Sequence, residues 1–345
     1  MTLRAEILEQ PEAAARFLAT QSDTIEVLAA VIREREVEHV LIAARGSSDH
    51  AAIYAQYVLG VRHGLTAGLA TPSVVSVYGA DPGLARSLVL AISQSGASPD
   101  ILAVVEAARR QGALTVALTN DPSSALAVAA DWTIALSAGP ERAIAATKTY
   151  TTSLLAVAAL SAALTGEPAD RAAVAAVPGA LASMLALEPQ MADAARAHAA
   201  ADRALVIARG YEYATAREWA IKIKELAHVF ADPYSAADFA HGPVALVEPG
   251  VPIIAIVREG PTAVGLTEQL DRLRAELDAD LMVLSDVPDA LASATRPVEI
   301  PRPPAEWLGP IATIVAGQLH AMHLTMARGK DPDAPRNIHK VTRTR

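Results

Sequence analysis

The sequence predicts an α/β protein made of two tandem domains, each a doubly wound, five-stranded parallel sheet flanked by helices as an αβα sandwich. The first observation is that short apolar runs alternate with amphipathic helical patterns, an order typical of βαβ units. The second is an internal repeat, in which residues 40–46 (VLIAARG) recur as residues 204–210 (ALVIARG). Right-handed crossovers between such strands produce an open sheet with helices on both faces.

The repeat keeps one register along the chain. Gly46 and Gly210 lie 164 positions apart, and the same offset takes Gly96 to Gly260, each of which follows an apolar run. A long helical pattern then closes each copy before a C-capping glycine, at residues 149–165 and 311–328. Landmarks in one register indicate two copies of one structural unit.

The expected elements follow in order along the chain. Residues 1–36 form a helical segment that Pro11 interrupts, because proline lacks the N–H that a helix interior needs. Residues 37–168 form the first domain, with strands at 40–44, 66–70, 88–92, 115–118 and 133–136. The remaining segments are a helical connector at 169–200, the second domain at 201–329 and a C-terminal tail at 330–345.

The composition limits the class of protein. The 345 residues carry a net charge of -9 and no cysteine, which argues against a nucleic-acid partner and excludes disulfides, thiolate nucleophiles and Cys-bound zinc. The longest apolar stretch, near residues 154–164, is interrupted by Ser161 and is too short to span a bilayer. The N-terminus lacks a signal-peptide pattern, so we expect a cytoplasmic protein without a membrane partner.

A hydroxyl-rich turn follows the most apolar predicted strand. The run LVLAI at 88–92 leads into a turn whose candidate ligands are Ser93, Gln94, Ser95 and Ser98. Backbone N–H groups at a helix start, together with serine hydroxyls, suit a bound phosphate. An ordinary polar turn capped by Ser98 explains the same residues equally well. The turn lacks the lysine of a nucleotide P-loop.

A second turn of this kind ends the first strand, where Gly46, Ser47 and Ser48 follow an apolar run. Both turns are expected at the carboxyl edge of one sheet, where open α/β sheets bind their ligands. The second copy has Tyr211-Glu212 and Arg258-Glu259 at the matching positions. We therefore expect a phosphate site in the first copy only.

Candidate acid–base groups lie in the second copy and in the tail. Glu218, Lys222 and Glu225 are spaced four and three apart on one helix face, which is more often a solvated ion-pair stripe. His241 at a Gly-Pro turn and Lys340 in a basic tail also have common solvated roles. With a phosphate anchor, however, a carboxylate, a ring-opening histidine and a lysine cation supply what aldose–ketose interconversion requires. If the substrate carries a 2-amino group, the same groups release ammonia through an imine.

Taken together, these motifs resemble the sugar isomerase (SIS) family. The resemblance rests on the repeat and on the motifs ARGSS at 44–48, SQSG at 93–96, AATK at 145–148, KIKE at 222–225, HGP at 241–243 and the tail at 335–342. It covers nearly the full length. Within the family it is nearest to the isomerase half of glucosamine-6-phosphate synthases and to SIS-type (type II) glucosamine-6-phosphate deaminases.

The resemblance implies a role for each matching residue. Glu225 is implied as the proton-shuttling base with Lys222 beside it, His241 as the ring-opening group from the partner subunit, and Lys340 as the group that reaches the sugar carbonyl. The implied phosphosugar ligands are Gly46, Ser47, Ser48, Ser93, Gln94, Ser95, Ser98, Ile144, Ala146 and Thr147. The family also implies a homodimer with shared sites that works without a metal or another cofactor.

Two residues depart from the synthases, because Ala146 and Ser98 stand where those enzymes have serine and threonine. We also expect no glutaminase half, since without cysteine a thiol mechanism for glutamine hydrolysis is excluded. The expected activity is therefore deamination of glucosamine 6-phosphate to fructose 6-phosphate and ammonia. The alternatives are a fructosamine-phosphate deglycase, a synthase-like isomerase without glutaminase and, from another class, a non-catalytic sugar-phosphate sensor.

Overall fold

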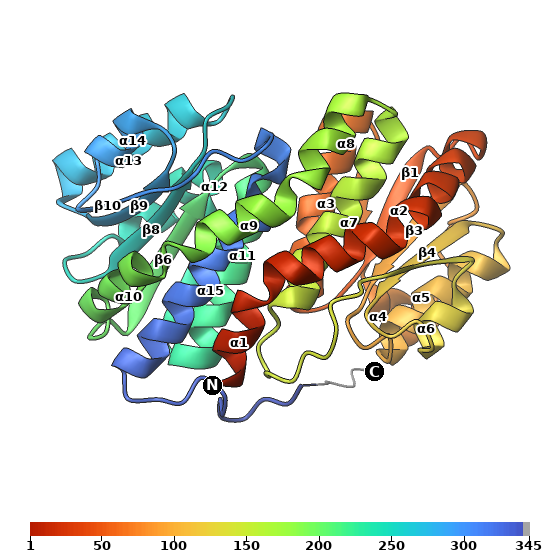
Figure 1. Cartoon of the computed structure of the whole chain (residues 1–345), viewed down its shortest axis with the longest axis horizontal. Helices are drawn as coiled ribbons and strands as arrows, with labels where there is room; N and C mark the ends of the chain where they lie inside the picture. Colours follow the sequence, from red (N-terminus) through yellow and green to blue (C-terminus); the bar gives the residue numbers. More distant parts are fainter. Residues whose placement is uncertain (341–345) are drawn as a thin grey trace. The chain divides into compact units, whose positions relative to one another are not determined.

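The computed structural model describes residues 1–340 and contains two five-stranded parallel sheets (Figure 1). The first sheet consists of β1 (His39–Ala43), β2 (Thr66–Leu69), β3 (Ser87–Ile92), β4 (Leu114–Thr119) and β5 (Trp132–Ala135). The second consists of β6 (Arg203–Ala208), β7 (Phe230–Ser235), β8 (Pro252–Val257), β9 (Asp280–Ser285) and β10 (Arg296–Glu299). The spatial orders are β2-β1-β3-β4-β5 and, read in reverse, β7-β6-β8-β9-β10. Both sheets thus have one topology, and the predicted fold class is confirmed.

The chain forms two compact units. Among the described residues, the N-terminal unit comprises Glu9–Glu141, Ala146–Pro178 and the tail residues His339 and Lys340. The C-terminal unit comprises Met1–Leu8, Arg142–Ala145 and Gly179–Ile338. Each unit therefore draws on separate stretches of sequence, and the domain boundaries at 37–168 and 201–329 stay a prediction.

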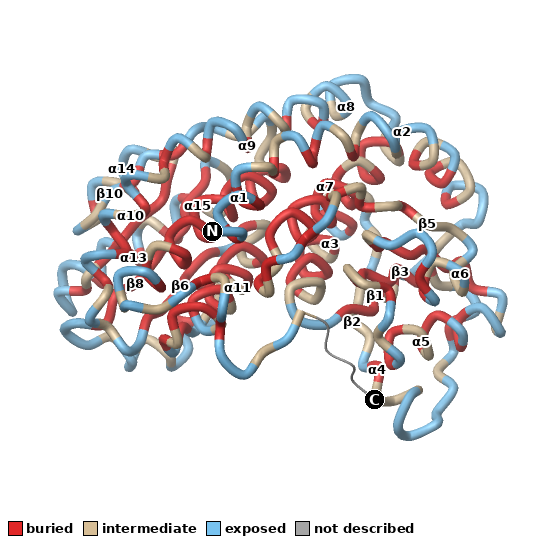
Figure 2. The backbone as a smooth tube through the Cα atoms, turned by 60° about the horizontal axis from the view of Figure 1, so that its bottom comes forward, coloured by how far each residue is buried: buried red, intermediate tan, exposed pale blue. Residues whose placement is uncertain are grey.

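The sheet of the N-terminal unit is covered on both faces. Its helices are α2 (Gln10–Glu34), α3 (Ser47–His63), α4 (Pro72–Ser76), α5 (Pro99–Arg110), α6 (Ala125–Ala129), α7 (Lys148–Thr165) and α8 (Pro168–Ala175). From β3, Val89 and Ala91 pack against α5 and α6, whereas Leu88 and Leu90 face side chains of α3 and α7. Alternate residues of one strand thus enter two cores, which explains why its sequence is continuously apolar. Five of the six residues of β3 are buried, and Figure 2 colours them accordingly.

The sheet of the C-terminal unit has the same two-sided cover. Its helices are α1 (Thr2–Leu8), α9 (Val177–Leu185), α10 (Glu188–Ala197), α11 (Tyr213–Lys222), α12 (Ala236–Ala240), α13 (Ala263–Leu277), α14 (Pro288–Ala292) and α15 (Gly309–Ala327). One face of the sheet forms a core with α12, α13 and α14. On the other side α11 packs against α15, a helix buried along most of its length, as expected for one that is apolar all round.

Two expectations about helices have a clear outcome. Pro11 lies in the first turn of α2, where its missing N–H is harmless, and the break from α1 falls at Glu9. Among residues 1–340, no single helix is long and apolar enough to cross a membrane. Taken together as a bent pair, Pro168–Leu185 and Glu188–Ala197 meet the requirement for a membrane span in length and composition alone.

Candidate functional site

The two predicted serine turns lie at neighbouring strand ends of the N-terminal unit. β1 and β3 pair in parallel, while β2 lies on the other side of β1, so the ends of β1 and β3 form the topological switch point of the sheet. Open α/β sheets bind their ligands at this point. The turn after β1 contains Gly46, Ser47 and Ser48, and the turn after β3 contains Ser93, Gln94, Ser95 and Ser98.

Glycine is required in both turns. Gly46 has a φ of 57° and Gly96 a φ of 59°, values that side chains rarely adopt. A Cβ on Gly96 would also lie 2.1 Å from the Ser124 hydroxyl oxygen. Within this turn, the hydroxyls of Ser93 and Ser95 accept backbone N–H groups at 3.2 and 3.3 Å. The hydroxyls are thereby held at the sheet edge.

Ser98 is not the ordinary helix cap that one interpretation of the sequence suggested. It occupies the N-cap position of α5, but its side chain accepts no capping hydrogen bond. The first N–H groups of any helix lack acceptors within the helix. At the start of α3, however, the N–H groups of Ser48 and Asp49 already donate to the carbonyls of Arg45 and Gly46. At the start of α5, Pro99 has no N–H and the N–H of Ile101 donates to Asp100. The serine hydroxyls are therefore the main donors that these turns offer to an anion.

An ion pair that the sequence analysis did not assign joins the two turns. The Nε of Arg45 donates to Oδ2 of Asp100, in the first turn of α5, at 2.9 Å. The side chain of Asp100 is 2% exposed and that of Arg45 46% exposed. The pair fixes the start of α5 to the end of β1 and, because the two charges cancel, adds no net charge at this edge. The repeated Ala-Arg-Gly motif was the signal that could have identified Arg45.

The matching edge of the second sheet is filled by the protein's own groups. Arg258, buried after β8, pairs with Glu212 at 3.4 Å and with Asp286 at 3.2 Å. Its guanidinium also donates to the Thr313 hydroxyl at 2.8 Å. Burial raises the pKa of Glu212 despite the opposing charge of Arg258. This internal cluster stands where the first copy has its serine turns.

A buried ion triad lies at the end of α11 in the C-terminal unit. The Lys222 ammonium is 2.7 Å from Glu225 and 3.4 Å from Glu218. The side chains of Glu218 and Lys222 are 0% and 2% exposed, whereas that of Glu225 is 26% exposed. Burial lowers the pKa of Lys222, but the charges of Glu218 and Glu225 outweigh it and raise the pKa above its ordinary value. Lys222 is therefore a cation, and the solvated-stripe interpretation is wrong.

Glu225 lies on a π-helix, where the sequence predicted a continuous α-helix. α11 ends at Lys222, and residues Ile223–Ala227 form a π-helical turn that ends at His228 with a φ of 57°. The wider turn still leaves Glu225 beside Lys222. π-helical turns occur frequently at functional sites, and here the turn presents the one partly exposed carboxylate of the triad. Glu218, which the sequence analysis left without a role, is the buried counter-charge.

His241 stands apart from this triad. It is exposed at the end of α12, before Gly242 with a φ of 144°. In the part of the chain that the structure describes, no hydrogen bond or ion pair joins it to Lys222 or Glu225. The structure thus does not bring His241 to the predicted base within one chain.

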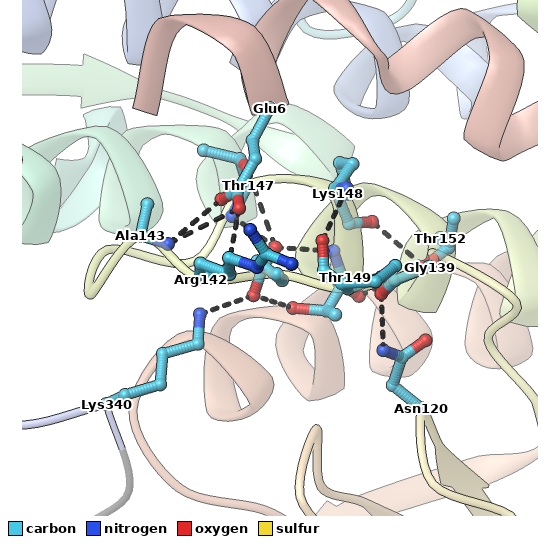
Figure 3. Close-up of polar contacts among 12 residues, drawn as sticks. Glu6, Asn120, Gly139, Arg142, Ala143, Thr147, Lys148, Thr149, Thr152 and Lys340 are labelled. Carbon is cyan, nitrogen blue, oxygen red and sulfur yellow. Dashed lines mark hydrogen bonds and ion pairs between the residues drawn. The ribbon is translucent and has the colours of Figure 1, made fainter. Parts of the chain in front are cut away.

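The tail residue Lys340 contacts a loop of the N-terminal unit (Figure 3). Its ammonium donates to Oε2 of Glu141 at 2.7 Å. Glu141 in turn accepts the N–H of Thr147, a predicted ligand that is fully buried. Ala146 is half-buried beside it. The predicted tail residues 341–345 lie outside the described part of the chain.

The segment Arg142–Ala145 belongs to the C-terminal unit. There Glu6 of α1 accepts the N–H groups of Arg142 and Ala143 at 2.6 and 3.2 Å. Ile144, another predicted ligand, is half-buried in this segment. The carboxylate of Glu6 thus fixes the backbone on which Ile144 lies.

Comparison with known proteins identifies the family. The model of the SIS domain matches residues 35–163 and 199–326. The glutamine–fructose-6-phosphate aminotransferase (isomerizing) of Symbiobacterium thermophilum is 31% identical over 97% of this chain. The chain spans 58% of the length of that relative.

Solved structures agree on the fold. A presumed phosphosugar isomerase from Silicibacter pomeroyi has a TM-score of 0.88 and 37% identity, with 96% of this chain and 100% of that chain covered. A glucosamine-6-phosphate deaminase from Thermotoga maritima has a TM-score of 0.79 at 21% identity, with all of both chains covered. At that identity the second likeness concerns the fold alone.

Proposed function

Because the chain belongs to the SIS family, we propose that it converts glucosamine 6-phosphate and water to fructose 6-phosphate and ammonia. The observation that carries the proposal is the Lys222–Glu225 pair, in which a partly exposed carboxylate is held by a buried cation. A carboxylate that is partly exposed and held in place by a cation can reach a substrate proton, remove it and return it, as a general base does. The name of the 31% identical relative, a glutamine–fructose-6-phosphate aminotransferase, supports a 6-phosphorylated sugar as the substrate class.

The proposed reaction begins with the open-chain aldose. His241 assists ring opening, and Glu225 removes the proton from C2 and returns it to C1. The C2 amine becomes an imine, which water hydrolyses to the C2 ketone with release of ammonia. Lys222 orients Glu225, and the Lys340 ammonium stabilises negative charge at the carbonyl oxygen. The phosphate does not react, and the serine turns of the N-terminal unit bind it.

Ammonia release from a panel of 6-phosphorylated amino sugars tests this proposal directly. We expect release from glucosamine 6-phosphate, with fructose 6-phosphate formed in equal amount and with no added metal or nucleotide. Cleavage of a fructosamine phosphate without turnover of glucosamine 6-phosphate would replace the deaminase by a deglycase. Tight binding of sugar phosphates without turnover of any of them would instead support a sensor.

We further propose a homodimer in which His241 serves the partner's site. The exposure of His241, with no contact to the triad of its own chain in residues 1–340, supports this arrangement. Mixing inactive Glu225→Gln and His241→Asn chains then creates one intact site in each mixed dimer. At equal mixing, about half of random dimers are mixed, so about a quarter of the parental activity returns. No recovery despite measured subunit exchange would assign His241 to its own chain or to no site.

A further inference from the structure

The loop before α7 contains a buried carboxylate that the reaction above does not use. The side chain of Glu141 is 0% exposed, and Figure 3 draws the groups around it. Its Oε1 accepts the N–H groups of Thr147 and Thr149, each at 3.0 Å, and its Oε2 accepts the Thr149 hydroxyl at 2.8 Å. Three donors from the start of one helix therefore hold this carboxylate in a fixed place.

The Thr147 hydroxyl also donates to Oε1 at 3.5 Å. The charged partner of this carboxylate is Lys340, whose ammonium lies 2.7 Å from Oε2. Burial alone raises the pKa of Glu141, but the charge and hydrogen bond of Lys340, with the N–H groups of Thr149 and Thr147, hold it below its ordinary value. Glu141 is therefore a carboxylate at neutral pH. A fully buried carboxylate without its cation is costly, so the loop itself favours the docked position of the tail.

We propose that Glu141 is the positioning residue of the C-terminal tail, because its fixed carboxylate docks the Lys340 ammonium and sets the direction of that group's other donors. An ammonium has three N–H donors. One is bonded to Glu141, which leaves two for a substrate oxygen. The catalytic part of this inference rests on the proposed role of Lys340, whereas the docking itself does not.

Lysine acylation measures the docking without any substrate. A limiting dose of an amine-reactive ester is applied to the intact protein, and mass spectrometry measures modification at each lysine. Exposed Lys224 is the internal reference, and Lys148, 1% exposed, is the buried one. We expect Lys340 to react several-fold more slowly than Lys224 in the parent protein and at a similar rate in Glu141→Gln. Equal reactivity of the two lysines in the parent protein would overturn the proposal even if the variant fails to fold.

Steady-state kinetics then measure whether docking serves the reaction. Glu141→Gln keeps the shape of the side chain, and we expect kcat to fall about 10–100-fold, as a misplaced catalytic group typically does. Thr149→Val is a graded comparison, because it removes one of the donors that hold Glu141 and keeps both members of the ion pair. Since the N–H groups of Thr147 and Thr149 still hold the carboxylate, we expect a smaller change of kcat and of Lys340 labelling than in Glu141→Gln.

A double-mutant cycle separates positioning from a structural role. If Glu141 acts through Lys340, adding Glu141→Gln to Lys340→Met lowers kcat no further. Additive losses, or a loss of kcat in Glu141→Gln with Lys340 still protected, would overturn the positioning role. Lys340 labelling that changes as expected in a protein with no activity toward sugar phosphates would instead refute the proposed function and leave the docking intact.

Discussion

Replacement of Lys222 by methionine tests whether the ion triad is the buried structure that the distances indicate. The substitution keeps the length of the side chain but leaves two carboxylates without their shared cation. Glu218 carries most of the cost, because its side chain is 0% exposed, whereas Glu225 at 26% exposure retains contact with water. Removing one partner of a buried pair typically costs about 3–5 kcal/mol of unfolding free energy.

We expect Lys222→Met to lose about 3 kcal/mol, the lower end of that range, because one of its two partners is partly hydrated. Urea unfolding at pH 7, followed by tryptophan fluorescence, measures the loss, and Trp219 in α11 is a buried local reporter. Lys224→Met is the matched control, since Lys224 lies two residues after Lys222 and is exposed. Its cost should stay within about 0.5 kcal/mol.

The double variant Glu218→Gln, Lys222→Met completes the test. Removing the buried negative charge as well should recover much of the lost stability, because a neutral amide needs no counter-ion. If Lys222→Met costs no more than Lys224→Met, the triad is not an electrostatic unit and the reasoning from burial fails.

Three further outcomes are expected. Glu225→Gln should lower kcat by about 10²–10⁴ with little change in KM, and initial rates near those of the parent would leave Glu225 a structural residue. Ser95→Ala should raise KM for phosphorylated sugars and leave kcat unchanged, because phosphate contacts are uniform binding; unchanged KM would remove this serine from the phosphate site. Burial lowers the pKa of His198 from 6.5 to about 4, so the unfolded chain binds the proton first as the pH falls. The free energy of unfolding should therefore fall as the pH is lowered from 6.5 to 4, by at most about 3 kcal/mol. The urea midpoint of His198→Asn should depend less on pH over this range than that of the parent protein.

The two parallel sheets could be predicted because the constraint on their strands is local. A parallel strand with both faces buried must be apolar throughout, as in β3, and the 164-residue offset between Gly46 and Gly210 gives the second sheet from the first. The places of the serine turns follow from these strands, since the turns come directly after β1 and β3. The order of strands and turns along the chain thus predicts that both serine turns lie at the carboxyl edge of the first sheet.

The electrostatic partners could not be predicted in the same way. Glu141 and Lys340 are 199 positions apart, and no pattern in the sequence connects them. The spacing of Glu218, Lys222 and Glu225 is the same for an exposed stripe and a buried triad, and the packing of α11 against α15 decides between the two. The π-helical turn at Ile223–Ala227 could not be predicted either, because its pattern of residues is also compatible with an α-helix.

The order in which the chain is synthesised matters for a protein whose units are discontinuous. Met1–Leu8 belong to the C-terminal unit, whose main segment, Gly179–Ile338, is made much later. His339 and Lys340, which belong to the N-terminal unit, follow that segment in the chain. Lys340 can therefore reach Glu141 only after the rest of that unit has been translated. Docking of the tail is consequently a late step in maturation, and a chain that stalls before residue 340 contains the serine turns and Glu225 but lacks the ammonium at Glu141.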